Sequence, residues 1–282
     1  MNKFPIYVIS KGRADLKHHT AKFLIEDGID FKIVVEPQEF DKYSERFGGQ
    51  RLLVLPFSNL GLGSIPARNW CWEHAKETGH KRHWIIDDNI KQMRTYKDGK
   101  RTRCDSKIGF QKCEEFVERY ENIAIAGINY SMFGFNVDRK LKPFFLNTRA
   151  YSTILILNSL PFRWRGRYNE DTDLCLQALT RDWCTVNINT FLMDKAQTMT
   201  CKGGNMAELY KGRGRLKMAR SLEYQWLKYP GLVKTTYRYE RPQHHVKWDY
   251  FKTRLKKIGV TDDSQRAQPE ASNTDQSSIG AP

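Results

Sequence analysis

Long apolar stretches are missing from this 282-residue chain. No run approaches the ~20 residues that a membrane-spanning helix needs, and the N-terminus lacks the pattern of a secretory signal peptide. A strand-like segment, Ile6-Tyr-Val-Ile9, begins almost at once. These absences predict a soluble, intracellular protein with no membrane partner.

Paired cysteines are also missing. The cysteines form no CxxC motif and do not cluster closely with histidines. This spacing argues against a zinc site and against a disulfide framework, and it favours reduced thiols in the core. The six are Cys71, Cys104, Cys113, Cys175, Cys184 and Cys201.

Acidic residues are few relative to basic ones, with 32 Asp and Glu against 47 Lys and Arg, a net charge of +15. Residues 261–282 carry one Arg against four acids, so residues 1–260 carry +18. A body this basic attracts polyanions, which places nucleic acid first among macromolecular partners. Because residues 261–282 contain almost no large apolar side chain, we expect a disordered tail there.

Strand and helix patterns alternate over the first 90 residues. Strands are predicted at 5–10, 31–35, 51–56 and 84–86, and helices near 20–26, 36–47 and 65–76. This order is typical of an α/β fold with a mostly parallel sheet and helices on its faces. The later part mixes helices at 108–120 and 171–180 with strands at 123–127, 150–157 and 184–188. We therefore expect one α/β domain over residues 1–260.

The first candidate site is the strand end His83-Trp-Ile-Ile-Asp-Asp-Asn89. In open α/β sheets, ligands bind at the carboxyl ends of the strands, where Asp87 and Asp88 would lie. Adjacent carboxylates repel one another, so a site that keeps both ionised usually holds a cation, and oxygen ligands suit Mg²⁺ or Mn²⁺. The alternative is an ordinary acidic turn after a strand.

A second acidic element follows three arginines in Arg163-Trp-Arg-Gly-Arg-Tyr-Asn-Glu-Asp-Thr-Asp173. Its acids begin a predicted helix, whose dipole favours carboxylates there. Helix capping accounts for one of them. Three acids directly behind three arginines indicate an anion-handling site with a general base.

The two acidic elements, some 80 residues apart, resemble those of GT-A nucleotide-sugar glycosyltransferases. In that class the first cluster binds the divalent cation that bridges the donor diphosphate. The later Glu-Asp supplies the base that deprotonates the acceptor in inverting members. By this resemblance Asp87 and Asp88 match the first motif, with Asn89 where an acid is often found, and Asp171 matches the base.

Longer motifs narrow the resemblance to the TET-associated glycosyltransferases of bacteriophages. They cover most of residues 5–250 and are Ser58–His74, His83–Asn89, Pro161–Leu176, Met199–Asn205 and Arg215–Leu222. Members of that family are understood to glycosylate 5-hydroxymethylpyrimidines, chiefly 5-hydroxymethylcytosine, in phage DNA. The resemblance implies a GT-A-like fold with a nucleotide-binding half, 1–90, and an acceptor half, 91–260. It also implies a UDP-sugar donor, a DNA acceptor and work in the cytoplasm of an infected bacterial cell. We expect a monomer.

Residue roles follow from the same resemblance. Asp171 would be the base, with Glu170 orienting donor or acceptor. Metal ligands would come from Asp87, Asp88, Asn89 and His244, the last of these preferred to His245. The donor would be held by Ser10, Lys11, Gly12, Arg13, Glu36, Arg68, Asn69, Asp87, Lys202 and Gly203. An ordinary turn, surface or helix-start role is the alternative at each of these positions.

DNA contacts are expected from two basic segments. Arginine and lysine side chains hold the phosphate backbone in such interfaces. The expected residues are Arg163, Arg165, Arg167, Lys211, Arg213 and Arg215. Two rival functions stay open: a glycosyltransferase acting on a protein, glycan or small molecule, and a metal-dependent nuclease or DNA-binding protein.

Overall fold

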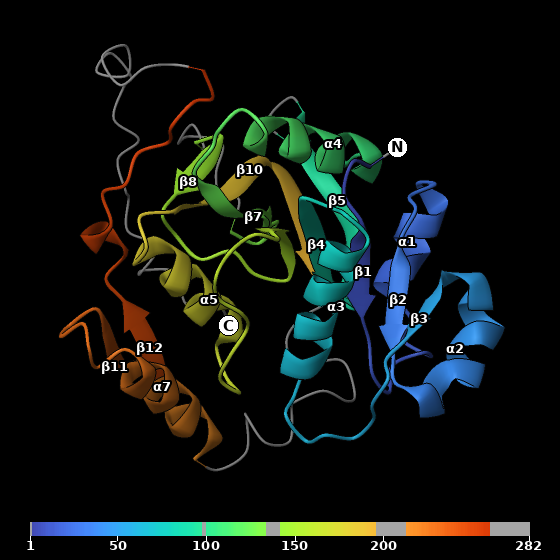
Figure 1. The fold of residues 1–282 in the computed structure, drawn as a ribbon, viewed down its shortest axis with the longest axis horizontal. Helices are drawn as coiled ribbons and strands as arrows, with labels where there is room; N and C mark the ends of the chain where they lie inside the picture. Colours follow the sequence, from blue (N-terminus) through green and yellow to red (C-terminus); the bar gives the residue numbers. More distant parts are fainter. Residues whose placement is uncertain (1, 98–99, 134–141, 196–212, 260–282) are drawn as a thin grey trace.

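A mixed β-sheet runs through the molecule, with helices on both faces (Figure 1). The computed structural model describes residues 2–97, 100–133, 142–195 and 213–259. The strand order is β3-β2-β1-β4-β9-β7-β10-β5-β6, and β8 pairs with β10 off this path. The α/β fold class with a large central sheet is confirmed.

The first half of the sheet is parallel. Strands β1 (Ile6–Ile9), β2 (Lys32–Val35), β3 (Leu52–Val54) and β4 (Arg82–Asp87) all pair in parallel. The connecting helices are α1 (Thr20–Glu26), α2 (Phe40–Phe47) and α3 (Ile65–Glu77), with short 3-10 turns at Pro37–Glu39 and Gly49–Arg51. The predicted β-α-β-α-β-α-β order is confirmed.

The second half is mixed because β9 (Thr153–Leu157) lies antiparallel between β4 and β7 (Ile123–Tyr130). Strand β10 (Cys184–Lys195) runs parallel to β7 and antiparallel to β5 (Ile90–Lys97) and β8 (Phe144–Leu146). Strand β6 (Lys100–Arg103) closes the edge beside β5. The predicted strand at 184–188 was too short, because β10 resumes pairing with β7 at Leu192 after a register shift.

Two apolar cores lie on opposite faces of the sheet. Ile6, Val8 and Ile86 pack with α1, α2 and α4 (Ser106–Val117) on one face. Their strand neighbours Tyr7 and Ile85 pack with α3 and α5 (Glu170–Leu179) on the other. Successive side chains of a strand point to opposite faces, so these continuously apolar strands need cover on both sides.

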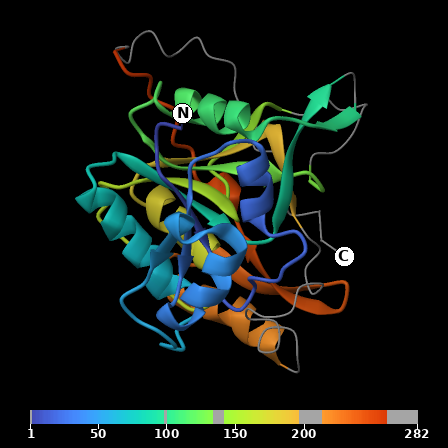
Figure 2. The same ribbon diagram turned by 90° about the vertical axis from the view of Figure 1, so that its right-hand side faces the viewer.

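A C-terminal module consists of α7 (Gly214–Gln225), the hairpin β11 (Val233–Arg238) and β12 (Arg241–Val246), and a 3-10 turn at Trp248–Tyr250. Leu222 and Trp226 pack with Leu176 and Leu179 of α5 in a third apolar cluster. Figures 1 and 2 both show this module beside α5. The expected tail at 261–282 lies outside the described residues.

Two absences concern the described residues. None of their helices is long and apolar enough to cross a membrane. Their five cysteines are free thiols. Four of them are buried, as expected for thiols in the core, whereas Cys104 is only partly buried; Cys201 lies outside the described part of the chain.

Candidate active site

Polar side chains converge where the parallel strands end. Asp87 is the last residue of β4, Ser10 follows β1, Tyr130 ends β7 and Lys195 ends β10. Ser152 joins them because β9 runs antiparallel to β4, so its beginning lies at the same edge. This edge is where open α/β sheets bind ligands.

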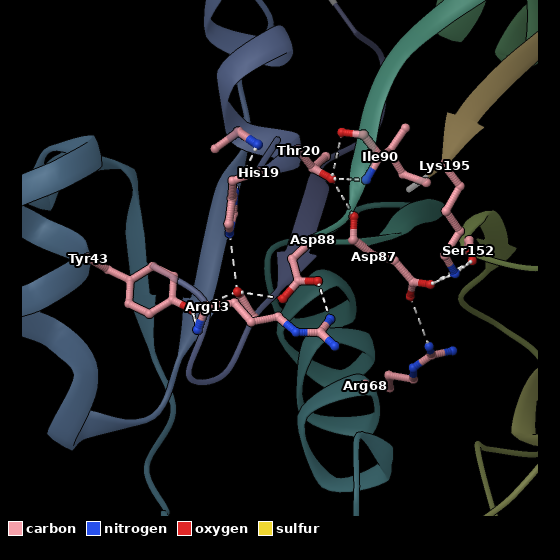
Figure 3. A network of polar contacts seen from close by, with 12 residues as sticks. Arg13, His19, Thr20, Tyr43, Arg68, Asp87, Asp88, Ile90, Ser152 and Lys195 are labelled. Atoms are coloured by element: carbon pink, nitrogen blue, oxygen red, sulfur yellow. Dashed lines mark hydrogen bonds and ion pairs between the residues drawn. The ribbon is translucent and has the colours of Figure 1, made fainter. Parts of the chain in front are cut away.

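The turn that carries the first acidic pair is held by α1. The Thr20 backbone N–H donates to the Asp88 carbonyl at 2.9 Å, and the Thr20 hydroxyl donates to the Asp87 carbonyl at 2.6 Å. The same hydroxyl accepts the Ile90 N–H at 2.9 Å (Figure 3). One threonine thus fixes the backbone of the turn that carries both carboxylates.

Asp87 is surrounded by cations. Its Oδ2 accepts from Lys195 Nζ at 2.9 Å and from Ser152 Oγ at 2.6 Å, and its Oδ1 lies 3.4 Å from Arg68 Nη2. Burial raises the pKa of Asp87, but Lys195 and Arg68 outweigh burial and hold the pKa at about 2. Asp87 is therefore an ionised carboxylate throughout the neutral range.

Asp88 points away from Asp87, toward the loop after β1 (Figure 3). Its Oδ1 accepts from Arg13 Nη1 at 2.7 Å and its Oδ2 accepts from Ser10 Oγ at 2.7 Å. Burial raises the pKa of Asp88 despite the opposing charge of Arg13. The two adjacent acids thus sit in separate surroundings, each with its own arginine.

The expected nucleoside residues after β1 come together with Glu36. Lys11 Nζ donates to Glu36 Oε1 at 2.7 Å and to Asn59 Oδ1 at 2.9 Å. The Gly12 N–H donates to Glu39 Oε1 at 2.6 Å. The loop is therefore tied to the residues that follow β2, at the same sheet edge as Asp88.

Arg68 lies near the start of α3, is only 8% exposed, and stacks on the Trp164 ring at 4.4 Å. Its Nη2 faces both acidic elements, at 3.4 Å from Asp87 and 3.6 Å from Glu170. Its Nε and Nη1 are buried and have no hydrogen-bond partner within the described part of the chain. Unpaired donors of a buried guanidinium are costly, so this group is suited to a bound anion.

Asn69 behaves differently from Arg68. Its Nδ2 donates to the Trp164 carbonyl at 3.0 Å, and its Oδ1 accepts the Trp164 N–H at 3.1 Å. Both ends of the amide thus tie α3 to the segment before α5. Asn69 fixes the wall of the site, and its expected contact with the donor stays a prediction.

Glu170 and Asp171 begin α5 after Asn169, whose backbone is left-handed at φ 56°. Glu170 Oε1 accepts from Ser64 Oγ at 3.2 Å, and Asp171 Oδ1 accepts its neighbour Thr172 N–H at 2.7 Å. Burial raises the pKa of Glu170; Arg68 opposes the rise and the charge of Asp171 adds to it. The second acidic pair therefore lies across Arg68 from Asp87.

The expected metal ligands do not form a metal centre in this arrangement. Among the described residues no group of three or more His, Cys, Asp or Glu side chains could hold an ion. Both carboxylates of the first pair are taken by cations, and His244 of β12 is a half-buried histidine whose pKa burial and Arg149 lower to about 3. A divalent cation at these carboxylates would have to displace Arg13 and Lys195. Ligation by Asp87, Asp88, Asn89 and His244 stays a prediction.

The expected DNA contacts divide into two groups. Arg163 Nε is bound to Glu73 at 2.6 Å, Arg165 holds the buried Asp173 through two nitrogens, and Arg167 donates to the Gly61 carbonyl. These internal contacts compete with any phosphate contact. Arg213 and Arg215 lie at the start of α7. Lys202, Gly203 and Lys211 lie outside the described residues.

Comparison with known proteins bears on this site. The model of the TET-associated glycosyltransferase family matches residues 4–204. The chain belongs to this family. It is a glycosyltransferase, and the matched range contains Asp87, Arg68, Glu170 and Asp171.

Similarity to solved structures is weaker than similarity to the family. A solved structure described as a nucleotide-diphospho-sugar transferase, from Desulfovibrio desulfuricans G20, is similar over 81% of this chain and 95% of its own. The identity is 13% and the TM-score 0.40, so the likeness carries no argument about function. Among curated proteins, no sequence matches this TET-associated glycosyltransferase.

Two functional candidates, Ser152 and Lys195, were not predicted from the sequence. Lys195 Nζ contacts Ser152 Oγ at 2.7 Å and Tyr130 Oη at 3.1 Å, in addition to Asp87. Burial lowers the pKa of Lys195, but Asp87 and Tyr130 outweigh it and raise the pKa above its ordinary value. The one available signal was the apolar run 191–193 ending on Asp194-Lys195, which indicates a longer strand.

Proposed function

We propose that this glycosyltransferase moves a sugar from a UDP-sugar to the hydroxymethyl group of 5-hydroxymethylcytosine in DNA, with inversion at the anomeric carbon. Family membership supports the class of reaction. The net charge of +18 over residues 1–260 supports a DNA acceptor. The enzyme would act as a monomer in the cytoplasm of an infected bacterial cell.

The observation that carries the proposal is the position of Arg68 between the two acidic elements. Its guanidinium faces Asp87 and Glu170 and keeps two buried N–H groups without a partner among the described residues. A diphosphate bound there would satisfy those donors with charge-assisted hydrogen bonds. The acids of α5 would then lie beside the sugar that the diphosphate carries.

The chemistry assigned to the chain is a single displacement. Asp171 takes the proton of the hydroxymethyl group as its oxygen attacks the anomeric carbon. The bond from that carbon to the phosphate oxygen breaks, and its electron pair leaves with UDP. Glu170, held by Ser64 and facing Arg68, positions the donor or acceptor.

Positive charge for the leaving UDP comes from side chains in this scheme. Arg68 meets the developing charge directly, because a fixed donor aimed at a charge that grows in the transition state accelerates the step. Lys195 keeps Asp87 ionised and in place, so that Asp87 in turn orients Arg68. Ser10, Lys11, Gly12, Arg13 and Glu36 form the nucleoside end of the site.

The test is transfer to DNA. Oligonucleotides with 5-hydroxymethylcytosine are incubated with a panel of UDP-sugars, digested, and their nucleosides weighed. The expected result is one nucleoside heavier by the transferred sugar, with no change in matched cytosine DNA. No mass gain with any donor would contradict the proposal.

The rival functions give different results in the same assay. An enzyme acting on a protein, glycan or small molecule would hydrolyse or transfer the donor without any stimulation by DNA. A nuclease would shorten the oligonucleotide. Family membership favours transfer over both nuclease and plain DNA binding.

A further inference from the structure

The C-terminal module carries much of the positive charge of the protein. Residues 213–259 contain thirteen Lys and Arg against three acids, a net charge of +10 within 47 residues. This segment lies beyond the range 4–204 that the family model matches. Nothing in the proposed reaction centre uses it.

Within the module, one face of α7 is a cationic stripe, formed by Arg213, Lys217 and Arg220, with Tyr224 at its end. Their spacing of four, three and four residues places all of them on one side of a helix. The three cations are exposed and Tyr224 is 66% exposed. These four side chains, together with Leu216, Ser221 and Gln225, line a cavity of about 630 Å³.

The stripe has no acidic partner among the residues that the structure describes. No ion pair between described residues includes Arg213, Lys217 or Arg220. The acid of α7 itself, Glu223, accepts the Thr235 N–H of the hairpin at 3.2 Å. The stripe therefore differs from Arg163 and Arg165, whose charges Glu73 and Asp173 offset.

The stripe is fixed next to the reaction centre. Asn169, which precedes Glu170, donates from Nδ2 to the Met218 carbonyl at 3.0 Å. Lys217 Nζ lies over the Tyr168 ring at 5.9 Å, and Trp226 Nε1 donates to Asp173 Oδ1 at 2.8 Å. A nucleic-acid strand bound along α7 would thus pass beside the first turn of α5, where Asp171 lies (Figure 1).

We propose that this face of α7 binds the phosphodiester backbone of the acceptor DNA, next to the nucleotide that is glycosylated. The inference rests on the proposed function and adds the surface that holds the acceptor. Exposed cations that form no ion pair with a described acid neutralise phosphates, and an exposed tyrosine beside them stacks on a base or sugar. These contacts carry no base-specific information, so binding along α7 is independent of sequence.

The experiment compares two triple variants. One replaces Arg213, Lys217 and Arg220 by Gln. The control replaces the exposed Lys22, Lys107 and Lys112 of α1 and α4 by Gln, which removes the same charge at the far side of the molecule from α7 (Figure 1). Binding to a labelled 5-hydroxymethylcytosine oligonucleotide is measured by fluorescence anisotropy over a range of salt concentrations. Transfer to the free 5-hydroxymethyl nucleoside is measured in parallel.

The stripe variant should bind DNA ~10–100-fold more weakly. The slope of its log affinity against log salt concentration should be smaller in magnitude by about 2, because each lost phosphate contact removes about 0.7–0.9 from the slope. Its transfer to the free nucleoside should equal that of the wild type, which also shows that it is folded. The control variant should keep most of the DNA affinity. Equal weakening in the two variants would overturn the proposed surface.

Failure of the proposed function is distinguishable from failure of this surface. A wild type that glycosylates DNA, with a stripe variant that binds and glycosylates DNA equally well, overturns the surface alone. A wild type that modifies no DNA and instead glycosylates an acidic protein in a stripe-dependent way overturns the DNA partner and the proposed function together.

Discussion

The two acidic pairs of this glycosyltransferase differ in the number of cations that surround them. Asp87 and Asp88 are tied to Lys195, Arg68 and Arg13. Glu170 faces one shared arginine at 3.6 Å, and burial raises its pKa. Burial raises the pKa of Asp88 as well, so the pairs differ in their ion pairs and not in burial. We propose from this comparison that charge compensation, more than the acid itself, separates an anchoring carboxylate in the first pair from a reactive one in the second.

The largest expected effect comes from the reactive pair. Asp171→Asn should lower the rate of transfer by ~10²–10⁴-fold, because the amide cannot accept the hydroxyl proton. Titration calorimetry should show UDP affinity unchanged. Glu170→Gln is the matched variant. Its rate of transfer should fall less, because the amide keeps a polar group beside Arg68. A larger loss for Glu170→Gln than for Asp171→Asn would exchange their roles.

The next effect concerns the arginine that both pairs share. Arg68→Met should weaken UDP binding by about 2 kcal/mol, roughly 30-fold, because charge-assisted hydrogen bonds to the diphosphate are lost. Arg68→Lys should recover only part of this, because an ammonium lacks the planar fork of donors. Calorimetry with UDP checks both, and unchanged affinity in Arg68→Met would remove Arg68 from the donor site.

The third expected effect comes from removing the ion pair between Lys195 and Asp87. Lys195→Met should destabilise the fold by about 2 kcal/mol near neutral pH, because Asp87 loses its closest cation. The folded-state pKa of about 2 lies below the ordinary value of about 4. The stabilisation is therefore present above pH ~4 and is lost as the pH falls toward 2.

Thermal melts from pH 2 to 7 check this prediction. The difference between wild type and Lys195→Met should shrink toward the acid end. Lys91→Met, at an exposed position of β5, should melt like the wild type at every pH. A difference that does not vary with pH would show that Lys195 stabilises by packing alone.

The smallest expected effect is that of metal removal. Because Arg68 and Lys195 occupy the surroundings of Asp87, chelation with EDTA should change UDP affinity and transfer by less than ~2-fold. Calorimetric titration with Mn²⁺ in the absence of UDP is the second readout and should show no binding. One tight Mn²⁺ site lost in Asp87→Asn would restore the metal role expected from the motif.

Much of the site was visible in the sequence, because its parts lie at the ends of predicted elements. Asp87 and Asp88 follow an apolar strand, and Glu170 and Asp171 begin a helix, as the structure has them. Arg163, Arg165 and Arg167 were predicted to contact DNA from their clustering. They also have internal partners, and the DNA contacts stay a prediction. Their ion pairs form between distant positions, such as Arg163 and Glu73, which local patterns do not reveal.

The amino-acid sequence by itself determined the order of strands and helices in the first half, since periodicity and turn residues are local properties. The sequence also determined the family, because long motifs of the chain match it. Only the tertiary structure decided that β10 extends to bring Lys195 onto Asp87, and that the two acidic pairs share Arg68. Such pairing depends on strand order and register, and these are set by the packing of segments remote in the chain.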